Sequence, residues 1–275
     1  MLFDILTEIF SYTFMLRAFV VGLLVSLCAS LLGVSLVLKR YSMIGDGLSR
    51  VGFCSLAIAI ALNKAPLTVS VPIVVLAAFL LLRLSENNKI KGDAAIALIS
   101  TSSLATGVII LSQTTGMNTD VCNFMFGSIL VMKSSDVLLS IALSAVVLTL
   151  FVLFYNKIFA VTFDENYAKA TGTNTEWYNM LIALLTAITI VLGMRMMGAL
   201  LISSLIIFPA LTSMRLLKGF RSVIISSAII SVVCFIIGII ASYIFATPTG
   251  ASIVMANIFL FIIFSSIYLL RGAAK

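Results

Sequence analysis

Long apolar runs separated by short polar breaks fill almost the whole sequence. A run of roughly 17–25 apolar residues is long enough to cross a bilayer as a helix. The pattern predicts about nine spans, or eight if the short sixth run joins the seventh as one broken helix rather than through a tight outer turn. The expected spans are residues 17–38, 45–62, 67–83, 94–112, 136–155, 179–193, 196–213, 222–246 and 252–270.

The composition fits a membrane interior. Hydrophobic residues make up 62% of the chain and charged residues 10%, and the mean hydropathy is +1.25. A soluble domain needs more charge on its surface, whereas lipid is a good solvent for apolar side chains. We therefore expect an all-α polytopic membrane protein with a single integral membrane domain over residues 1–275. This composition excludes most soluble enzymes and nearly all nucleic-acid binders.

Two shorter segments are expected beside the spans. Residues 1–16 carry acidic side chains but no lysine or arginine, and they predict an amphipathic helix lying on the outer face rather than a signal peptide. Residues 121–132 are apolar but too short to cross a bilayer. They predict a re-entrant or interfacial helix.

The distribution of lysine and arginine predicts the orientation of the spans. Loops on the cytoplasmic side of membrane proteins carry an excess of these residues. If the turn after the first span is cytoplasmic, twelve of the 17 fall on that side, so the N-terminus is expected outside and the C-terminus inside a cell membrane. The twelve are Lys39, Arg40, Arg83, Lys89, Lys91, Lys157, Lys169, Arg215, Lys218, Arg221, Arg271 and Lys275. Arg17, Lys64, Lys133 and Arg195 are expected outside, and Arg50 lies within a span.

Asp46 and Arg50 are the strongest candidates for function. They stand at the beginning of the second span, where an ionisable group usually faces a cavity, a partner or a pathway. Residues four apart share one face of a helix, so the two side chains can form an ion pair. A charge pair at the membrane boundary, with Arg50 reaching toward water, is an equally acceptable interpretation of these charges alone.

Other polar residues in the spans offer less chemistry. The fourth span carries Ser100, Thr101, Ser102, Ser103, Thr106 and Gly107, and the seventh carries Gly198, Ser203, Ser204 and Pro209. Small residues and hydroxyls of this kind usually serve close helix packing, which we prefer here to a substrate lining. The cysteines Cys28, Cys54, Cys122 and Cys234 have no CxxC spacing and are expected to be buried. Histidine is absent, and no nucleophile–base set indicates an enzyme.

Four segments, in order and with suitable spacing, resemble the permease family of zinc and manganese ATP-binding-cassette importers. They are residues 39–53 (KRYSMIGDGLSRVGF), 123–130 (NFMFGSIL), 163–172 (FDENYAKATG) and 198–211 (GALLISSLIIFPAL). The resemblance implies a fold like that of vitamin B12 importer permeases and a dimer of permeases. It also implies two cytoplasmic ATPase subunits and an extracytoplasmic metal-binding protein. The chain has no GxxxxGK[ST] motif, so ATP would be bound by a partner and no cofactor is expected here.

The resemblance assigns candidate roles to a few residues. Asp46, Ser49 and Arg50 would lie on the substrate pathway, with Asp46 as the candidate metal ligand. The basic turn at residues 214–222 would contact the ATPase through Arg215, Lys218, Gly219 and Arg221, with residues 163–172 as the next candidate.

One position departs from the family pattern. The family motif Asp-x-x-Ser continues with a histidine, and here Arg50 follows instead. A guanidinium stays protonated and has no lone pair for a cation. Three interpretations remain open: a permease for a divalent cation of the zinc, manganese or iron class; the same fold with another substrate or in a heterodimer; and, more distantly, a secondary transporter driven by an ion gradient.

Overall fold

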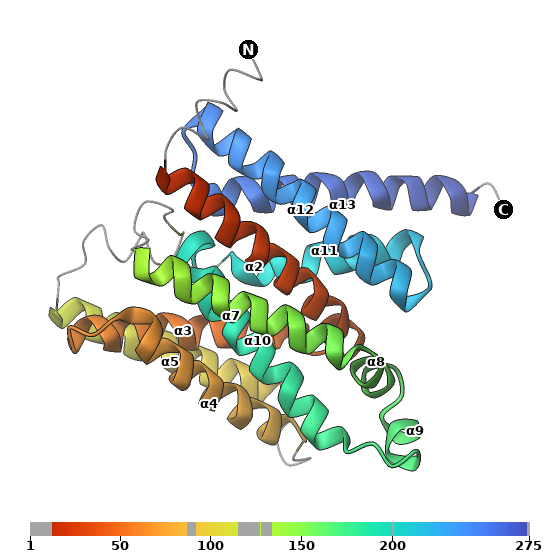
Figure 1. Cartoon of the computed structure of the whole chain (residues 1–275), viewed down its shortest axis with the longest axis horizontal. Coiled ribbons are helices and arrows are strands. Elements are labelled where there is room, and N and C mark those ends of the chain that lie inside the picture. The colour runs from red at the N-terminus through yellow and green to blue at the C-terminus, as the bar shows by residue number, and fades with distance from the viewer. Residues whose placement is uncertain (1–12, 87–91, 115–126, 128–133, 200, 274–275) are drawn as a thin grey trace.

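The computed structural model of the chain describes residues 13–86, 92–114, 127, 134–199 and 201–273, and all regular elements in these ranges are helices (Figure 1). Eight of the described helices are long and apolar enough to cross a membrane. They are α2 (Thr13–Leu38), α3 (Ser42–Ala61), α4 (Pro66–Glu86), α5 (Gly92–Thr114), α7 (Ser134–Leu153), α10 (Thr175–Met197), α12 (Phe220–Phe245) and α13 (Thr249–Ala273). The count equals the lower of the two expected values, but for another reason: the sixth and seventh runs form two separate helices, and the second of these, Ile202–Leu216, is too short to span.

The shorter helices are α8 (Tyr155–Phe163), α9 (Glu165–Ala170) and α11 (Ile202–Leu216). Helices α8 and α9 occupy the polar segment between α7 and α10. Side-chain caps begin α9 and α10, because Asp164 accepts a hydrogen bond from the Tyr167 N–H at 3.0 Å and Asn174 accepts one from the Trp177 N–H at 3.3 Å. The chain thus leaves the apolar layer at the end of α7 and returns to it along α10.

Helix α10 is longer than the sequence indicated. The expected span covered residues 179–193, whereas the helix runs from Thr175 to Met197 and is mostly buried. It ends at Gly198, whose φ of 88° lies in the region that favours glycine. The chain then turns into α11, and Ile202 packs against Gly193. Helix α11 has 15 residues, or about 22 Å at 1.5 Å per residue, which is too short to cross a bilayer alone.

The interior of the molecule is built around α2, α3 and α10. At least two thirds of the spanning window of each of these helices is buried, against 11% for α13 at the periphery. Helices α2 and α11 are in close backbone contact, since a Cβ added to Gly33 would lie 2.0 Å from the Ile206 carbonyl oxygen. Hydroxyls also join helices: Ser231 donates to the Ser26 carbonyl of α2 at 2.9 Å. Three of the cysteines, Cys28, Cys54 and Cys234, are buried as expected.

Parts of the two interfacial predictions lie outside the described residues. Residues 1–12 of the expected outer helix are not among the described residues. The remaining residues, Thr13–Leu16, form the first turn of α2 rather than a separate surface helix. Cys122 and the expected re-entrant helix at residues 121–132, apart from Gly127, also lie outside them. Both predictions therefore stay predictions.

Candidate functional site

Asp46 and Arg50 form an ion pair in the first half of α3. The Arg50 Nη2 and Asp46 Oδ2 atoms lie 3.0 Å apart, as the i, i+4 spacing predicted. The two side chains are 27% and 30% exposed for Asp46 and Arg50, on a helix that is otherwise largely buried. The Nε–H of Arg50 has no hydrogen-bond partner among the described residues. The pair is therefore partly accessible, although the Arg50 Nε atom itself is buried and its N–H is unsatisfied.

Ser49 lies in different surroundings from the Asp46–Arg50 pair, although it is on the same helix. Ser49 is fully buried, and its hydroxyl donates to the Asp46 carbonyl oxygen at 2.8 Å. It therefore does not share the open side of α3 with Asp46 and Arg50. Helix α11 passes close by, because Ser203 lies beside Gly45. The accessible polar groups at this level are the ion pair and the half-buried Ser203.

The hydroxyls of α5 do not serve close packing in the way that the sequence suggested. Thr101, Ser102 and Thr106 are exposed, and each donates a hydrogen bond to a carbonyl of its own helix. Ser100 and Gly107 are buried, and Gly107 packs on Cys54 and Phe53 of α3. The packing explanation therefore holds for one side of α5 only. The other side presents hydroxyls on the surface of a spanning helix that packs beside α3.

A second Asp–Arg pair was not predicted. The Arg195 Nη1 and Asp136 Oδ2 atoms lie 3.1 Å apart, and the side chains are only 6% and 11% exposed. Asp136 lies in the first turn of α7 and Arg195 in the last turn of α10, where each charge is favourable to its helix dipole. The prediction that Arg195 lies toward the outer side of the membrane stays a prediction, but its burial was not predicted: α10 continues past the expected end of its span and buries this residue.

Lys39 anchors a third charged cluster, near the turn between α2 and α3. Its side chain is 7% exposed, it donates a hydrogen bond to the Asn179 side chain of α10, and its Nζ lies 3.7 Å from Glu165 of α9. Lys169 contacts the same carboxylate at 3.2 Å. Burial alone would raise the pKa of Glu165, but the hydrogen bond from Lys169 and the positive charge of Lys39 outweigh it and lower this pKa. The cluster connects α9 to the turn that leads into Asp46.

The basic turn and the helix pair α8–α9 meet at Phe220, the first residue of α12. Its ring lies 4.8 Å from that of Phe159 and 5.8 Å from that of Tyr155. Phe163 and Tyr167 are 76% and 65% exposed, which is unusual for aromatic side chains without a partner. We define the coupling face by the exposed members of both segments: Phe159, Phe163, Tyr167, Arg215, Lys218, Gly219 and Arg221. Of these, Arg215 also lies over the Phe261 ring, 5.5 Å from its centre.

The described part of the chain offers few metal ligands in one place. No group of three or more His, Cys, Asp or Glu side chains there could hold a cation. Asp46 is an accessible carboxylate in a spanning helix, and Asp136 is buried in its own ion pair. Asp93 and Glu176 are exposed carboxylates at the ends of α5 and α10, whereas Asp46 lies farther inside its helix and is already paired with Arg50.

Comparison with known proteins gives the family. Residues 11–268 match the ABC 3 transport family. The chain belongs to this family. The match covers all the described spanning helices, so the fold and the family assignment apply to the same residues.

Named relatives of this ABC 3 family protein are transport-system membrane proteins. The high-affinity zinc uptake system membrane protein ZnuB of Haemophilus influenzae is 29% identical over 246 residues, which is 90% of this chain and 94% of ZnuB. The manganese transport system membrane protein MntC of Listeria monocytogenes is 28% identical over 260 residues, which is 94% of this chain and 92% of MntC.

Solved structures of ABC transporters share the fold. The structure of PsaBC from Streptococcus pneumoniae in complex with Fab matches with a TM-score of 0.88 and 26% identity, over 99% of this chain and 100% of the matched chain. An ABC transporter in an inward-facing conformation matches with a TM-score of 0.74 over 91% of this chain and 85% of its own, and at 13% identity it supports the fold alone.

Proposed function

We propose that this protein is the permease subunit of an ATP-binding-cassette importer for a divalent metal cation of the zinc, manganese or iron class. The observation that carries the proposal is the match to PsaBC over nearly the full length of both chains. The zinc and manganese systems named for ZnuB and MntC support the substrate class. Transport is the activity of this chain, and it binds no cofactor of its own.

The proposed assembly contains two permeases, two ATPase subunits and an extracytoplasmic metal-binding protein. ATP is bound and hydrolysed by the ATPase chains, for which this chain supplies a docking surface. The assembly works in the plasma membrane with the N-terminus of the permease outside and its C-terminus inside. The excess of lysine and arginine near the ends of α2, α4, α7 and α11 supports this orientation.

Single cysteines in a variant without native cysteines test the orientation. Lys64→Cys and Gln113→Cys are expected to react with an impermeant maleimide in sealed cells, and Asn174→Cys only after the cells are opened. The opposite pattern would invert the proposed topology.

The proposed substrate route passes the open side of α3. Asp46 attracts the cation, and Arg50 sets the net charge of the site. Ser49 contributes only through the hydrogen bond from its hydroxyl to the Asp46 carbonyl oxygen. Because Arg50 neutralises Asp46, the site of one chain is weak for a cation. This observation favours a second version of the proposal, in which the permease works in a heterodimer or carries another substrate. A secondary transporter is the more distant alternative.

We place the ATPase contact on the coupling face. Arg215, Lys218, Gly219 and Arg221 supply its basic turn, and Phe163 and Tyr167 supply an apolar patch. An exposed aromatic patch outside the spanning region is expected to be covered by a partner chain. The paired variants Arg215→Glu/Arg221→Glu and Phe163→Ser/Tyr167→Ser are expected to lower ATP hydrolysis coupled to transport while the permease still inserts. If only the aromatic variant has an effect, the main contact belongs to α8–α9.

Uptake into reconstituted vesicles tests the function. The permease is purified with its ATPase and binding protein and reconstituted into vesicles. Uptake of zinc, manganese and ferrous ions is then measured without ATP, with ATP inside the vesicles, and with ATP outside them. ATP-dependent uptake of one of these cations is the expected result. Uptake that needs a proton or sodium gradient but no ATPase would support the secondary transporter, and ATP hydrolysis stimulated by a substrate other than a cation would support the second version.

A further inference from the structure

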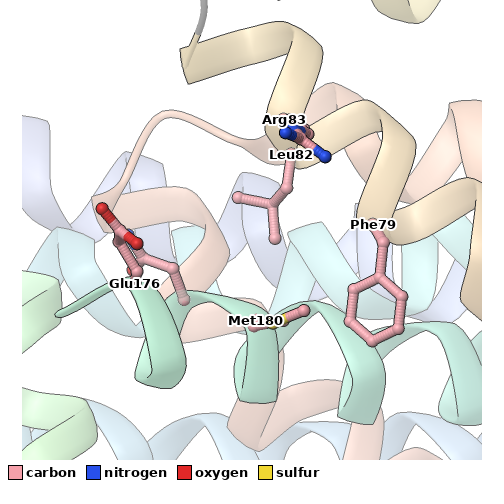
Figure 2. A pocket seen from close by; sticks show the side chains of 6 residues that line it. Phe79, Leu82, Arg83, Glu176 and Met180 are labelled. Carbon is pink, nitrogen blue, oxygen red and sulfur yellow. The ribbon is translucent and has the colours of Figure 1, made fainter. Parts of the chain in front are cut away.

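A groove between the ends of α4 and α10 carries charge at its mouth and apolar side chains along its floor. Its volume is about 380 Å³, and its lining comes from Phe79, Leu82, Arg83, Glu176, Asn179 and Met180. Figure 2 shows Arg83 on α4 and Glu176 on α10 at the same end of the groove, with Met180 and Phe79 farther along it. None of these residues belongs to the proposed substrate route or to the coupling face.

The mouth of the groove lies at the level of a membrane interface. Arg83 is next to the end of one spanning window, Pro66–Leu84, and Glu176 is next to the beginning of another, Thr175–Arg195. Trp177, half exposed beside Glu176, has the position of an interfacial aromatic residue. Both charged side chains are exposed, and neither has an ion-pair partner among the described side chains.

The floor of the groove continues into the apolar layer. A second hollow of about 190 Å³ follows it along α10 and is lined by Phe79, Trp177, Met180, Leu181 and Leu184. Met180 is exposed there although it lies within a helix that is otherwise mostly buried. A ligand that fills both hollows would have a polar end at the interface and an apolar part that points into the bilayer.

We propose that this groove binds one phospholipid with a primary-amine headgroup, of the phosphatidylethanolamine type. The phosphate accepts hydrogen bonds from the Arg83 guanidinium, the ammonium donates to the Glu176 carboxylate, and an acyl chain lies along Phe79, Met180 and Leu184. Two opposite charges at one mouth match a zwitterionic headgroup. An anionic headgroup or free phosphate would satisfy Arg83 but would be repelled by Glu176, and a choline headgroup has no N–H to donate.

The single tryptophan of the chain makes this site measurable. Trp177 lines the groove, so its fluorescence is quenched when a lipid with brominated acyl chains occupies it. The full-length permease is reconstituted in phosphatidylcholine vesicles that contain a small fraction of brominated phosphatidylethanolamine. A second sample uses phosphatidylethanolamine vesicles that contain the same small fraction of brominated phosphatidylcholine. The hydrogen bond from the ammonium to Glu176, which a choline headgroup cannot make, supports a preference of about ten-fold, so quenching by the ethanolamine lipid should exceed that expected from its mole fraction.

Substitutions at the mouth separate this proposal from general contact with lipid. Glu176→Gln is expected to reduce quenching by the ethanolamine lipid to the mole-fraction value, and Arg83→Gln, which removes the contact to the phosphate that both headgroups share, is expected to weaken quenching by both lipids. Lys64→Gln and Asp93→Asn, which remove interfacial charges elsewhere, should leave the quenching unchanged. Equal quenching by both headgroups in the unmodified protein would overturn the proposal. Brominated phosphatidylglycerol gives the second test. If the unmodified protein and the Glu176→Gln variant both bind it at least as strongly as the unmodified protein binds the ethanolamine lipid, the proposal is overturned in favour of an anionic site. The measurement needs no ATPase and no metal, so its outcome is independent of the proposed function.

Discussion

The two Asp–Arg pairs of the molecule have nearly equal atom-to-atom distances, 3.0 Å for Asp46–Arg50 and 3.1 Å for Asp136–Arg195, but they lie in opposite surroundings. The first joins neighbouring turns of one helix and is more than a quarter exposed. The second joins the ends of two helices and is nearly closed off from its surroundings. The same chemical groups can therefore be a site that opens to a ligand in one place and a fixed link between helices in the other.

Burial decides this difference. An accessible ion pair within one helix contributes about 0.3–0.5 kcal/mol to stability, because water or a ligand can replace either partner. Removing one partner of a buried pair leaves an uncompensated charge and destabilises by about 3–5 kcal/mol. Breaking the Asp46–Arg50 pair should therefore destabilise the fold only slightly, whereas breaking the Asp136–Arg195 pair should destabilise it strongly. On this basis we propose a role in function for the first pair and a role in structure for the second.

The largest expected effect comes from breaking the buried pair. Arg195→Leu removes the cation and leaves Asp136 charged in an apolar environment, so the free energy of unfolding should fall by about 3–5 kcal/mol. Thermal unfolding of the purified permease in detergent measures this as a lower Tm and a lower yield of folded protein. Asp136→Leu/Arg195→Leu, which removes both charges, should recover most of the loss. If the double variant is as unstable as the single one, packing rather than charge explains the effect.

The sequence predicts the Asp46–Arg50 pair but not the Asp136–Arg195 pair, because the two residues of the second pair are far apart in the sequence. The i, i+4 spacing of Asp46 and Arg50 predicts contact without any knowledge of the fold, whereas Asp136 and Arg195 meet only after α7 and α10 have packed together. A signal was present, because each residue ends an apolar run with an isolated charge. That signal places a residue at a helix end but does not name its partner, and so the burial of Arg195 against Asp136 was not predicted.

The spans follow the same logic. Apolar runs long enough to cross a bilayer located all eight spanning helices, because hydropathy is a local property. The end of α10 and the short helix α11 were less well predicted, since the turn at Gly198 depends on packing against neighbouring helices. The exposed hydroxyls of α5 and the lipid groove were not predicted at all, because exposure is a property of the assembled bundle.

The second prediction uses the accessible pair. Arg50→His removes the standing positive charge beside Asp46 and adds a nitrogen donor, because imidazole is largely neutral at pH 7. Uptake of zinc or manganese in reconstituted vesicles should rise by about ten-fold, which corresponds to roughly 1.4 kcal/mol in the free energy of the site. Asp46→Ala in the Arg50→His background should abolish the gain. If the unmodified protein already transports briskly and Asp46→Ala changes nothing, the route lies instead along Ser203 and the hydroxyls of α5.

The third prediction concerns stability at the accessible pair. Asp46→Asn should lower the free energy of unfolding by only about 0.3–0.5 kcal/mol, because the Arg50 side chain is partly exposed and can reach water. The same detergent unfolding assay that detects the loss in Arg195→Leu should therefore barely resolve this change. A loss comparable to that of Arg195→Leu would remove the distinction between the two pairs.

The smallest expected effect lies in the Lys39 cluster, which is intermediate between the two pairs because Lys39 is buried and Glu165 is partly exposed. The pKa of Glu165 is lower in the folded protein than its ordinary value of 4.5, so the cluster stabilises the fold above about pH 4.5 and this contribution is lost as the pH falls through the lowered pKa. Between pH 5 and pH 3 the Tm of the unmodified protein should therefore fall more steeply than that of Glu165→Gln, in which this carboxylate is absent. Lys39→Met should flatten the pH dependence in part, because one of the charges that lower the pKa is gone, and Lys39→Arg should restore it. If Lys39→Met keeps the full pH dependence, Lys169 alone holds Glu165, and α9 is not linked through charge to the turn that leads into Asp46.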